Sequence, residues 1–197
     1  MYKRQILGIN SREDLALAEK IIQVKLRHFF LNKGVTLIDP ETNYFSYDTI
    51  IKKDVTIFPN VFIGEGVKID SGSNILSFSH LENCYIKKNV SIGPFARIRG
   101  NTVLNANNKI GNFVELKHVI SGKDVKINHL SYIGDTSIGR STNIGAGSIT
   151  CNYDGHKKNK TFIGSNAFVG SNSTMIAPLK IGNNSTIGAG SVITKDV

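Results

Sequence analysis

An aliphatic residue recurs at every sixth position along most of the chain, and this recurrence is the main indication of how the chain folds. The run begins at Ile51 and is interrupted by occasional five-residue steps and by one longer gap. The repeated positions, called anchors below, are Ile51, Ile57, Ile63, Ile69, Ile75, Leu81, Ile86, Ile92, Ile98, Leu104, Ile110, Leu116, Ser121, Ile127, Ile133, Ile138, Ile144, Thr150, Ile163, Val169, Met175, Ile181, Ile187 and Ile193.

A six-residue period fits neither an α-helix nor an alternating strand. It is typical of the hexapeptide repeat of a left-handed parallel β-helix, in which each hexad forms one short strand and one corner, and three hexads close a triangular coil. The anchors then point inward, as does a smaller residue four positions later, such as Val55 or Ala96. Glycine and asparagine are frequent at the corners, where some residues need positive φ. Crossover connections between parallel strands are almost always right-handed, so only a repeat as long as this one justifies predicting left-handed ones.

The first 50 residues follow a different pattern. Ser11, with Asp14 three positions later, is a helix-start signal, and the apolar stripe after it predicts an amphipathic helix that ends near Lys33 and Gly34. The stripe consists of Leu15, Ala18, Ile22, Leu26, Phe29 and Phe30. We therefore expect an all-β chain preceded by one amphipathic α-helix. Residues 1–50 form the helix and an extended lead-in, residues 51–197 form the β-helix, and the helix either caps the β-helix or links it to another domain.

The longer gap in the repeat extends from Thr150 to Ile163 and carries polar residues that the repeat does not require, among them Asn152, Tyr153 and Lys158. Such an insertion leaves the coils intact and places a loop beside one of them. We interpret it as a functional loop.

His129 lies two positions after the anchor Ile127, where a side chain points out of the prism. The coil that follows has seventeen residues, so Ala146 stacks on His129 and leaves space beside the imidazole. A lone histidine is more often a solvated surface residue. Within about one coil, however, the chain also supplies a carboxylate, a cation and hydrogen-bond donors, in Glu115, Lys117, Tyr132, Asn143 and the insertion.

Composition narrows the classes of partner. The net charge is +9, but the basic residues form no block of five or more, and aromatic residues make up 8% of the chain. We therefore expect a small anionic substrate rather than nucleic acid. Because we find neither an apolar run of about 20 residues nor a signal peptide, we expect no membrane span. Two cysteines, Cys84 and Cys151, are too few for a disulfide scaffold, so we expect a reducing, cytoplasmic location. A metal hydrolase such as a trimeric carbonic anhydrase is an alternative, but the five histidines form no close ligand pair.

Several longer strings go beyond the repeat itself. They are GPFARIRG, IGNFVELK, NHLSYIGD, NIGAGSITCNYDGHKKNKTFIG, FVGSNSTMIAP and IGAGSVITKDV. From about Ile6 to Val197, the chain resembles the acetyltransferase half of the bacterial bifunctional N-acetylglucosamine-1-phosphate uridyltransferase/glucosamine-1-phosphate N-acetyltransferase family. The resemblance implies transfer of an acetyl group from acetyl-CoA to the amine of glucosamine-1-phosphate, in UDP-N-acetylglucosamine biosynthesis.

The resemblance also implies roles for individual residues and a homotrimer with active sites between subunits. His129 matches the general base, and Glu115 stands where a carboxylate orients the histidine or the substrate. The positions that match the sugar-phosphate site are Arg99, Lys117, Tyr132, Asn143, Asn152 and Tyr153, and Lys158 adds a cation from the loop. The acetyl-CoA groove matches Ala146, Ser171 and Ala189.

The chain departs from the family at both ends. The family's nucleotidyltransferase domain is expected to be absent, so Mg²⁺ and its ligand Asn10 have no role here, and the β-helix is expected to be truncated at its C-terminal end. We treat residues 1–5 as an artefact and leave them out of the fold prediction. These departures keep two alternatives open, a non-catalytic fragment and another hexapeptide-repeat acyltransferase.

Overall fold

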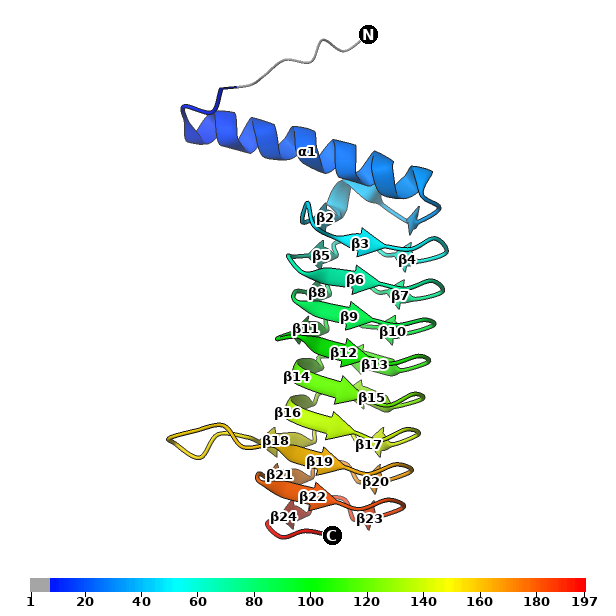
Figure 1. Ribbon diagram of the computed structural model, residues 1–197, viewed down its shortest axis with the longest axis vertical. Helices are drawn as coiled ribbons and strands as arrows, with labels where there is room; N and C mark the ends of the chain where they lie inside the picture. The colour runs from blue at the N-terminus through cyan, green and yellow to red at the C-terminus, as the bar shows by residue number, and fades with distance from the viewer. Residues whose placement is uncertain (1–7) are drawn as a thin grey trace.

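A computed structural model describes residues 8–197, so the prediction for residues 1–5 lies outside the described residues. The chain forms a left-handed parallel β-helix whose coils stack into a triangular prism, and one α-helix lies across an end of the stack (Figure 1). Both parts of the predicted fold class are confirmed.

Three flat faces make up the prism, and every strand pairs in parallel with the strand one coil away. Face 1 is built from β1 (Thr36–Leu37), β4 (Thr56–Ile57), β7 (Asn74–Ile75), β10 (Ser91–Ile92), β13 (Lys109–Asn112), β15 (Lys126–His129), β17 (Asn143–Ile144), β20 (Phe168–Val169) and β23 (Thr186–Ile187). Face 2 is built from β2 (Tyr44–Phe45), β5 (Phe62–Ile63), β8 (His80–Leu81), β11 (Arg97–Arg99), the first part of β14 (Glu115–Ser121), the first part of β16 (Tyr132–Ile138), β18 (Ile149–Cys151), β21 (Thr174–Ile176) and β24 (Val192–Ile193). Face 3 is built from β3 (Ile50–Ile51), β6 (Val67–Ile69), β9 (Cys84–Ile86), β12 (Thr102–Leu104), the second parts of β14 and β16, β19 (Thr161–Ile163) and β22 (Leu179–Ile181).

The anchors fill the prism in three stacked columns, one behind each face. Ile57, Ile75 and Ile92 on face 1 are fully buried, and they pair in register from coil to coil. Ser121 is a polar exception among the anchors. Its buried hydroxyl is satisfied by a hydrogen bond from the side chain of Asn108. The core is therefore a narrow column in which each coil is covered only by its two neighbours.

The stack of strands begins before Ile51. Thr36 and Leu37 of β1 already pair with β4, and Tyr44 and Phe45 of β2 pair with β5. A short 3₁₀ helix, η1 (Pro40–Thr42), joins these two strands. The extended lead-in expected before the repeat thus supplies two strands of the first coil.

Corners hold residues in the left-handed region of φ, as the repeat predicts. Eight of these residues are asparagines: Asn60, Asn83, Asn89, Asn101, Asn107, Asn166, Asn172 and Asn184. Four successive levels of the corner between faces 1 and 2 are different, because they use Phe78, Phe95, Phe113 and Leu130, whose φ angles are 62°, 55°, 54° and 52°. The three phenylalanine rings are exposed and stack 4.9 and 5.2 Å apart. We call these four residues the apolar ridge.

The helix α1 (Arg12–Asn32) begins and ends as the sequence predicts. Ser11 caps it, and its hydroxyl accepts the backbone N–H of Asp14 while the Asp14 carboxylate accepts that of Ser11. The predicted apolar stripe is only partly correct. Leu15 and Phe29 are 55% and 52% exposed, whereas Gln23 and Phe30 are buried. The reason is geometric: α1 extends beyond the narrow end of the prism, so only part of it covers the first coil (Figure 1).

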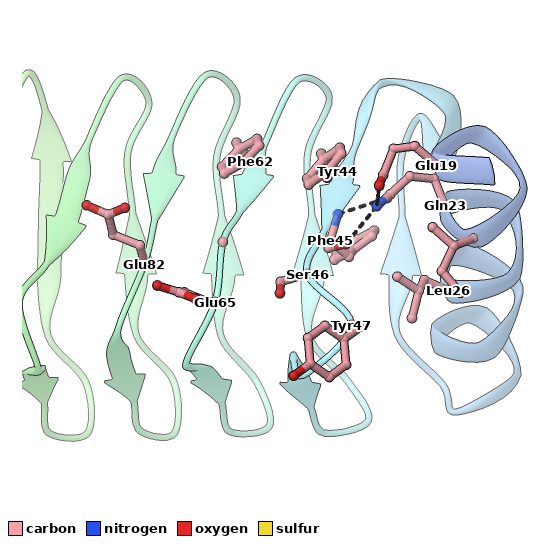
Figure 2. A pocket seen from close by; sticks show the side chains of 12 residues that line it. Glu19, Gln23, Leu26, Tyr44, Phe45, Ser46, Tyr47, Phe62, Glu65 and Glu82 are labelled. Atoms are coloured by element: carbon pink, nitrogen blue, oxygen red, sulfur yellow. Dashed lines mark hydrogen bonds between the residues drawn. The ribbon is translucent and has the colours of Figure 1, made fainter. Parts of the chain in front are cut away.

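A glutamine fixes the helix to the first coil. The Gln23 amide donates to the carbonyl of Phe45 at 2.7 Å and accepts the N–H of Phe45 at 2.9 Å (Figure 2). Beside these bonds lies a hollow of about 400 Å³, which Tyr44, Phe62 and Glu82 help to line. The helix therefore docks through one buried polar clamp as well as through apolar contact.

Replacing Gln23 by leucine should lower the free energy of unfolding by about 1–3 kcal/mol. The substitution leaves the N–H and C=O of Phe45 buried without partners, which costs about this much. Urea denaturation followed by circular dichroism measures the change. Lys25→Ala, an exposed position on the same helix, is the control, and equal stability of the two variants would contradict the clamp.

Candidate active site

Polar side chains gather on the outside of face 2, at the level of β11, β14 and β16. The strand register places Arg99 beside Lys117, Lys117 beside Gly134, and Glu115 beside Tyr132. The four residues other than Gly134 each flank an inward anchor, so strand alternation directs their side chains to the surface. The repeat itself therefore builds a compact polar patch from three successive coils.

Cations outnumber the carboxylates in this patch. Arg99 donates through Nε to Glu115 Oε1 at 2.7 Å, and its Nη2 atom lies 2.6 Å from the same oxygen. Lys158, which comes from the insertion, lies against Lys117. This contact, together with desolvation and the charge of Arg99, lowers the pKa of Lys117, while the charge of Asp135 opposes the shift. Three cations held this close, with one carboxylate bound to Arg99, favour an anionic ligand.

Two hydrogen-bonding groups lie directly over Gly134. A Cβ atom added to Gly134 would come within 2.6 Å of the Tyr132 hydroxyl and 2.8 Å of the Asn152 side-chain nitrogen. A side chain at this position would displace both groups, and glycine leaves them in place. The patch presents a phenol and an amide beside its cations, as a hydroxyl-rich ligand requires.

His129 lies at the end of β15, on the corner between faces 1 and 2. Its Nδ1 atom is 2.7 Å from Oδ1 of Asn112, the residue one coil below in register. Because an amide oxygen only accepts, the neutral tautomer that fits this contact is the one with its proton on Nδ1 and a free lone pair on Nε2. His129 also lines a hollow of about 460 Å³ together with Phe95 and Phe113. The imidazole is thus oriented and accessible, as a general base must be.

A column of small residues continues from His129 along the same corner. The N–H of Gly147 donates to the carbonyl of His129, that of Asn172 to Ala146, and that of Gly190 to Ser171. These bonds place Ala146 over His129, with Ser171 and then Ala189 above. Next to the column, a Cβ atom on Gly145 would approach the Ser171 nitrogen to 2.5 Å, so adjacent coils are in close contact.

The insertion leaves the prism at the corner between faces 2 and 3 and projects away from it (Figure 1). Tyr153 and Lys158 form an antiparallel bridge near its base. Asp154 accepts the N–H groups of His156 and Lys157 and the amide of Asn159, and these bonds lower its pKa to about 2. The loop is therefore held by its own hydrogen bonds.

The chain does not bring all the predicted site residues together. Arg99, Glu115, Lys117, Tyr132, Asn152 and Lys158 share the patch on face 2, and His129, Ala146, Ser171 and Ala189 share the neighbouring corner. Asn143 lies on face 1, Tyr153 is 61% exposed on the loop, and Asn10 precedes α1 at the far end of the molecule.

Three residues of this region were not among those predicted from the sequence. Asn112 orients His129, and it lies seventeen residues earlier, so counting one coil back would have found it. Arg97 lies 4.0 Å from the carboxylate of Glu115. Asp135 bonds to Asn152. The contacts of Arg97 and Asp135 depend on side-chain directions, which the repeat does not specify.

Over residues 8–197, no group of three or more His, Cys, Asp or Glu side chains is placed to hold a metal ion. In the same range, no helix is long and apolar enough to cross a membrane.

The sequence matches one described protein family and is similar to named bacterial proteins. The family described as "Bacterial transferase hexapeptide (six repeats)" matches residues 83–118 and 160–195. The protein called bifunctional protein GlmU in Wolbachia pipientis wMel is 57% identical over 190 residues, which are 96% of this chain and 44% of that protein. The protein of the same name in Anaplasma marginale (strain Florida) is 50% identical over 99% of this chain and 46% of its own length. The chain thus spans less than half the length of these relatives.

A solved structure supports the fold. LpxA from Acinetobacter baumannii superposes with a TM-score of 0.54 at 22% identity, over 82% of this chain and 67% of that one. At this identity the match bears on the architecture alone.

Proposed function

The chain belongs to the GlmU family, of whose members it spans less than half, and on this premise we propose that it transfers an acetyl group from acetyl-CoA to the amine of glucosamine-1-phosphate. The relatives and the hexapeptide fold support an acyltransferase role in general. The choice of sugar phosphate as acceptor rests mainly on one observation, the three cations gathered on face 2 beside Tyr132 and Asn152.

In this proposal the patch on face 2 binds the sugar phosphate. Arg99, Lys117 and Lys158 attract the phosphate, which carries nearly two negative charges at neutral pH. Tyr132 and Asn152 are placed to bond to sugar hydroxyl groups. Glu115 holds the Arg99 guanidinium in position through two contacts. The sugar is then fixed by charge and by directed hydrogen bonds together.

His129 acts as the general base, and Asn112 keeps its Nε2 lone pair available. The substrate amine attacks the thioester carbonyl carbon, a C–N bond forms, and Nε2 takes the proton that the amine loses. The C–S bond then breaks, and the CoA thiolate leaves and takes up the proton from the imidazolium. Acetyl-CoA lies along the small-residue column of Ala146, Ser171 and Ala189, where backbone N–H groups can stabilise the oxyanion.

The proposal includes a homotrimer, because one chain divides the site residues between different faces. Asn143 on face 1 and Tyr153 on the loop then come to a site from a neighbouring copy. The apolar ridge supports such packing, since its four large side chains are exposed beside the hollow that His129 lines. Sedimentation equilibrium should give three chains per particle, and a monomer at micromolar concentration would contradict this part of the proposal.

The direct test follows free-thiol release from acetyl-CoA in the presence of glucosamine-1-phosphate. We expect turnover with this acceptor and little with glucosamine, which lacks the phosphate that the cations bind. Turnover with another sugar phosphate but not this one would favour a different hexapeptide-repeat acyltransferase. A folded protein that binds no acetyl-CoA in calorimetry would support the non-catalytic alternative.

The lowered pKa of Lys117 predicts how sugar-phosphate affinity depends on pH. A bound dianion stabilises the charged form, so it raises the Lys117 pKa above its value in the free protein. Affinity should therefore be greatest below the free-protein pKa and fall as pH rises through it, because binding must then take up a proton. In calorimetry between pH 7 and 10, Lys158→Met should move this fall to higher pH.

Lys53→Met, which removes a lysine near α1, serves as the control and should leave the pH dependence as in the natural chain. An affinity that does not change between pH 7 and 10 would contradict a role for Lys117 in binding the phosphate.

A further inference from the structure

We propose that Asp135 is a positioning residue that holds Asn152, and with it the base of the insertion, in the geometry that the sugar site requires. The proposal rests on the function proposed above and deepens it, because neither the family pattern nor the chemistry of the reaction assigns Asp135 a role.

Asp135 occupies the corner between faces 2 and 3, directly below the point where the insertion begins. Its Oδ2 accepts a hydrogen bond at 2.5 Å from the side-chain amide nitrogen of Asn152, which lies one coil further along the prism. Its Oδ1 lies 3.2 Å from Nδ1 of His118, one coil on the other side. The carboxylate is largely enclosed, with 15% of its side chain exposed. A charged acceptor of this kind makes a strong and directional bond.

Within residues 8–197, Asn152 makes no side-chain hydrogen bond other than the one to Asp135. It is 6% exposed, its backbone carbonyl accepts the N–H of Asn159, and this bond closes the base of the loop. Because Asp135 engages the Asn152 nitrogen, the amide cannot flip, and its Oδ1 keeps a fixed direction. The Tyr132 hydroxyl lies beside the same amide, over Gly134. One carboxylate therefore sets both the amide orientation and the exit direction of the loop.

The backbone conformation of Asp135 makes a clean substitution available. Its φ is 49°, a region in which glycine carries no steric penalty, and Gly100 occupies the equivalent corner position two coils earlier. Asp135→Gly thus removes the carboxylate and keeps the turn. Asp124→Gly is a matched control: Asp124 has a φ of 61° and bonds to Asn107 on a different corner. Both changes add similar freedom to the unfolded chain.

Two measurements test the proposal. By NMR, Asp135→Gly should accelerate hydrogen exchange at the backbone amide of Asn159 by about tenfold. The reason is that this N–H donates to the carbonyl of Asn152, which the substitution no longer holds in place. The Lys157 amide, which Asp154 holds within the loop, should change less. In kinetics, KM for glucosamine-1-phosphate should rise by about tenfold, the usual effect of losing one hydrogen bond, while kcat and KM for acetyl-CoA stay within about twofold.

The outcomes separate this inference from the function on which it rests. If the natural chain does not acetylate glucosamine-1-phosphate, the proposed function fails, and exchange at Asn159 still decides whether Asp135 holds the loop. If Asp135→Gly matches Asp124→Gly in exchange or in KM, the positioning role is overturned. If Asp135→Gly does not fold, Asn152→Ala takes its place in the exchange measurement, and unchanged exchange at the Asn159 amide would overturn the link between Asp135 and the loop. Where both fold, the double variant should show no further rise in KM, and an additive rise would overturn action through Asn152.

Discussion

Replacing His129 by alanine should lower kcat for acetyl transfer by about 10²–10⁴-fold, the usual range for loss of a general base. KM for the sugar phosphate should change little, because the binding groups lie on face 2 and keep their register with one another. Thiol release under saturating substrates measures the effect. The prediction depends on the Nε2 lone pair that the 2.7 Å contact with Asn112 leaves available.

His28→Ala is the control for this experiment, because His28 is an exposed histidine on α1, at the end of the prism. Its kcat should equal that of the natural chain. Normal turnover in His129→Ala would remove the histidine from the mechanism and leave orientation by the cation patch as the main contribution to rate.

Replacing Leu116 by alanine should lower the free energy of unfolding by about 2–5 kcal/mol. Leu116 is fully buried and lies between Glu115 and Lys117, so the cavity forms directly beneath the polar patch. Neighbouring coils are held apart by paired strands and cannot close the space. Urea denaturation provides the measurement, and the loss should be accompanied by weaker sugar-phosphate binding, since Glu115 and Lys117 flank the cavity on the same strand.

Ile120→Ala is the matched control, because Ile120 lies on the same strand, β14, and is 56% exposed. Its effect should stay within about 0.5 kcal/mol, as for most surface substitutions. A loss equal to that of Leu116→Ala would mean that Ile120 is covered in solution by another copy or another segment.

The period of six predicted most of the fold, because each inward position of the prism demands an aliphatic or small residue. Counting along this period also placed Ala146 over His129, a relation that the Gly147 hydrogen bond confirms. The same arithmetic could not predict which helix residues are buried. Leu15 and Phe29 are apolar in sequence but lie where the prism offers no surface.

The candidate site was predictable only as a set of residues, and its internal contacts were not. The pairing of Glu115 with Arg99 and the link from Asp135 to Asn152 depend on which rotamers reach across a coil. The apolar ridge was also unexpected, because bulky residues rarely adopt positive φ. Phe78, Phe95 and Phe113 adopt it in three successive coils. Their rings stack on one another from coil to coil.

The stacking of coils has a further consequence for how this molecule can change over evolutionary time. Each coil contacts only the coils on either side of it, so a change at one level is felt strongly by its neighbours and weakly beyond them. The level of His129 is several coils from α1. The helix and the first coils can therefore diverge, or be joined to other domains, with little effect on chemistry further along the prism. The molecule is in this sense modular along a single axis.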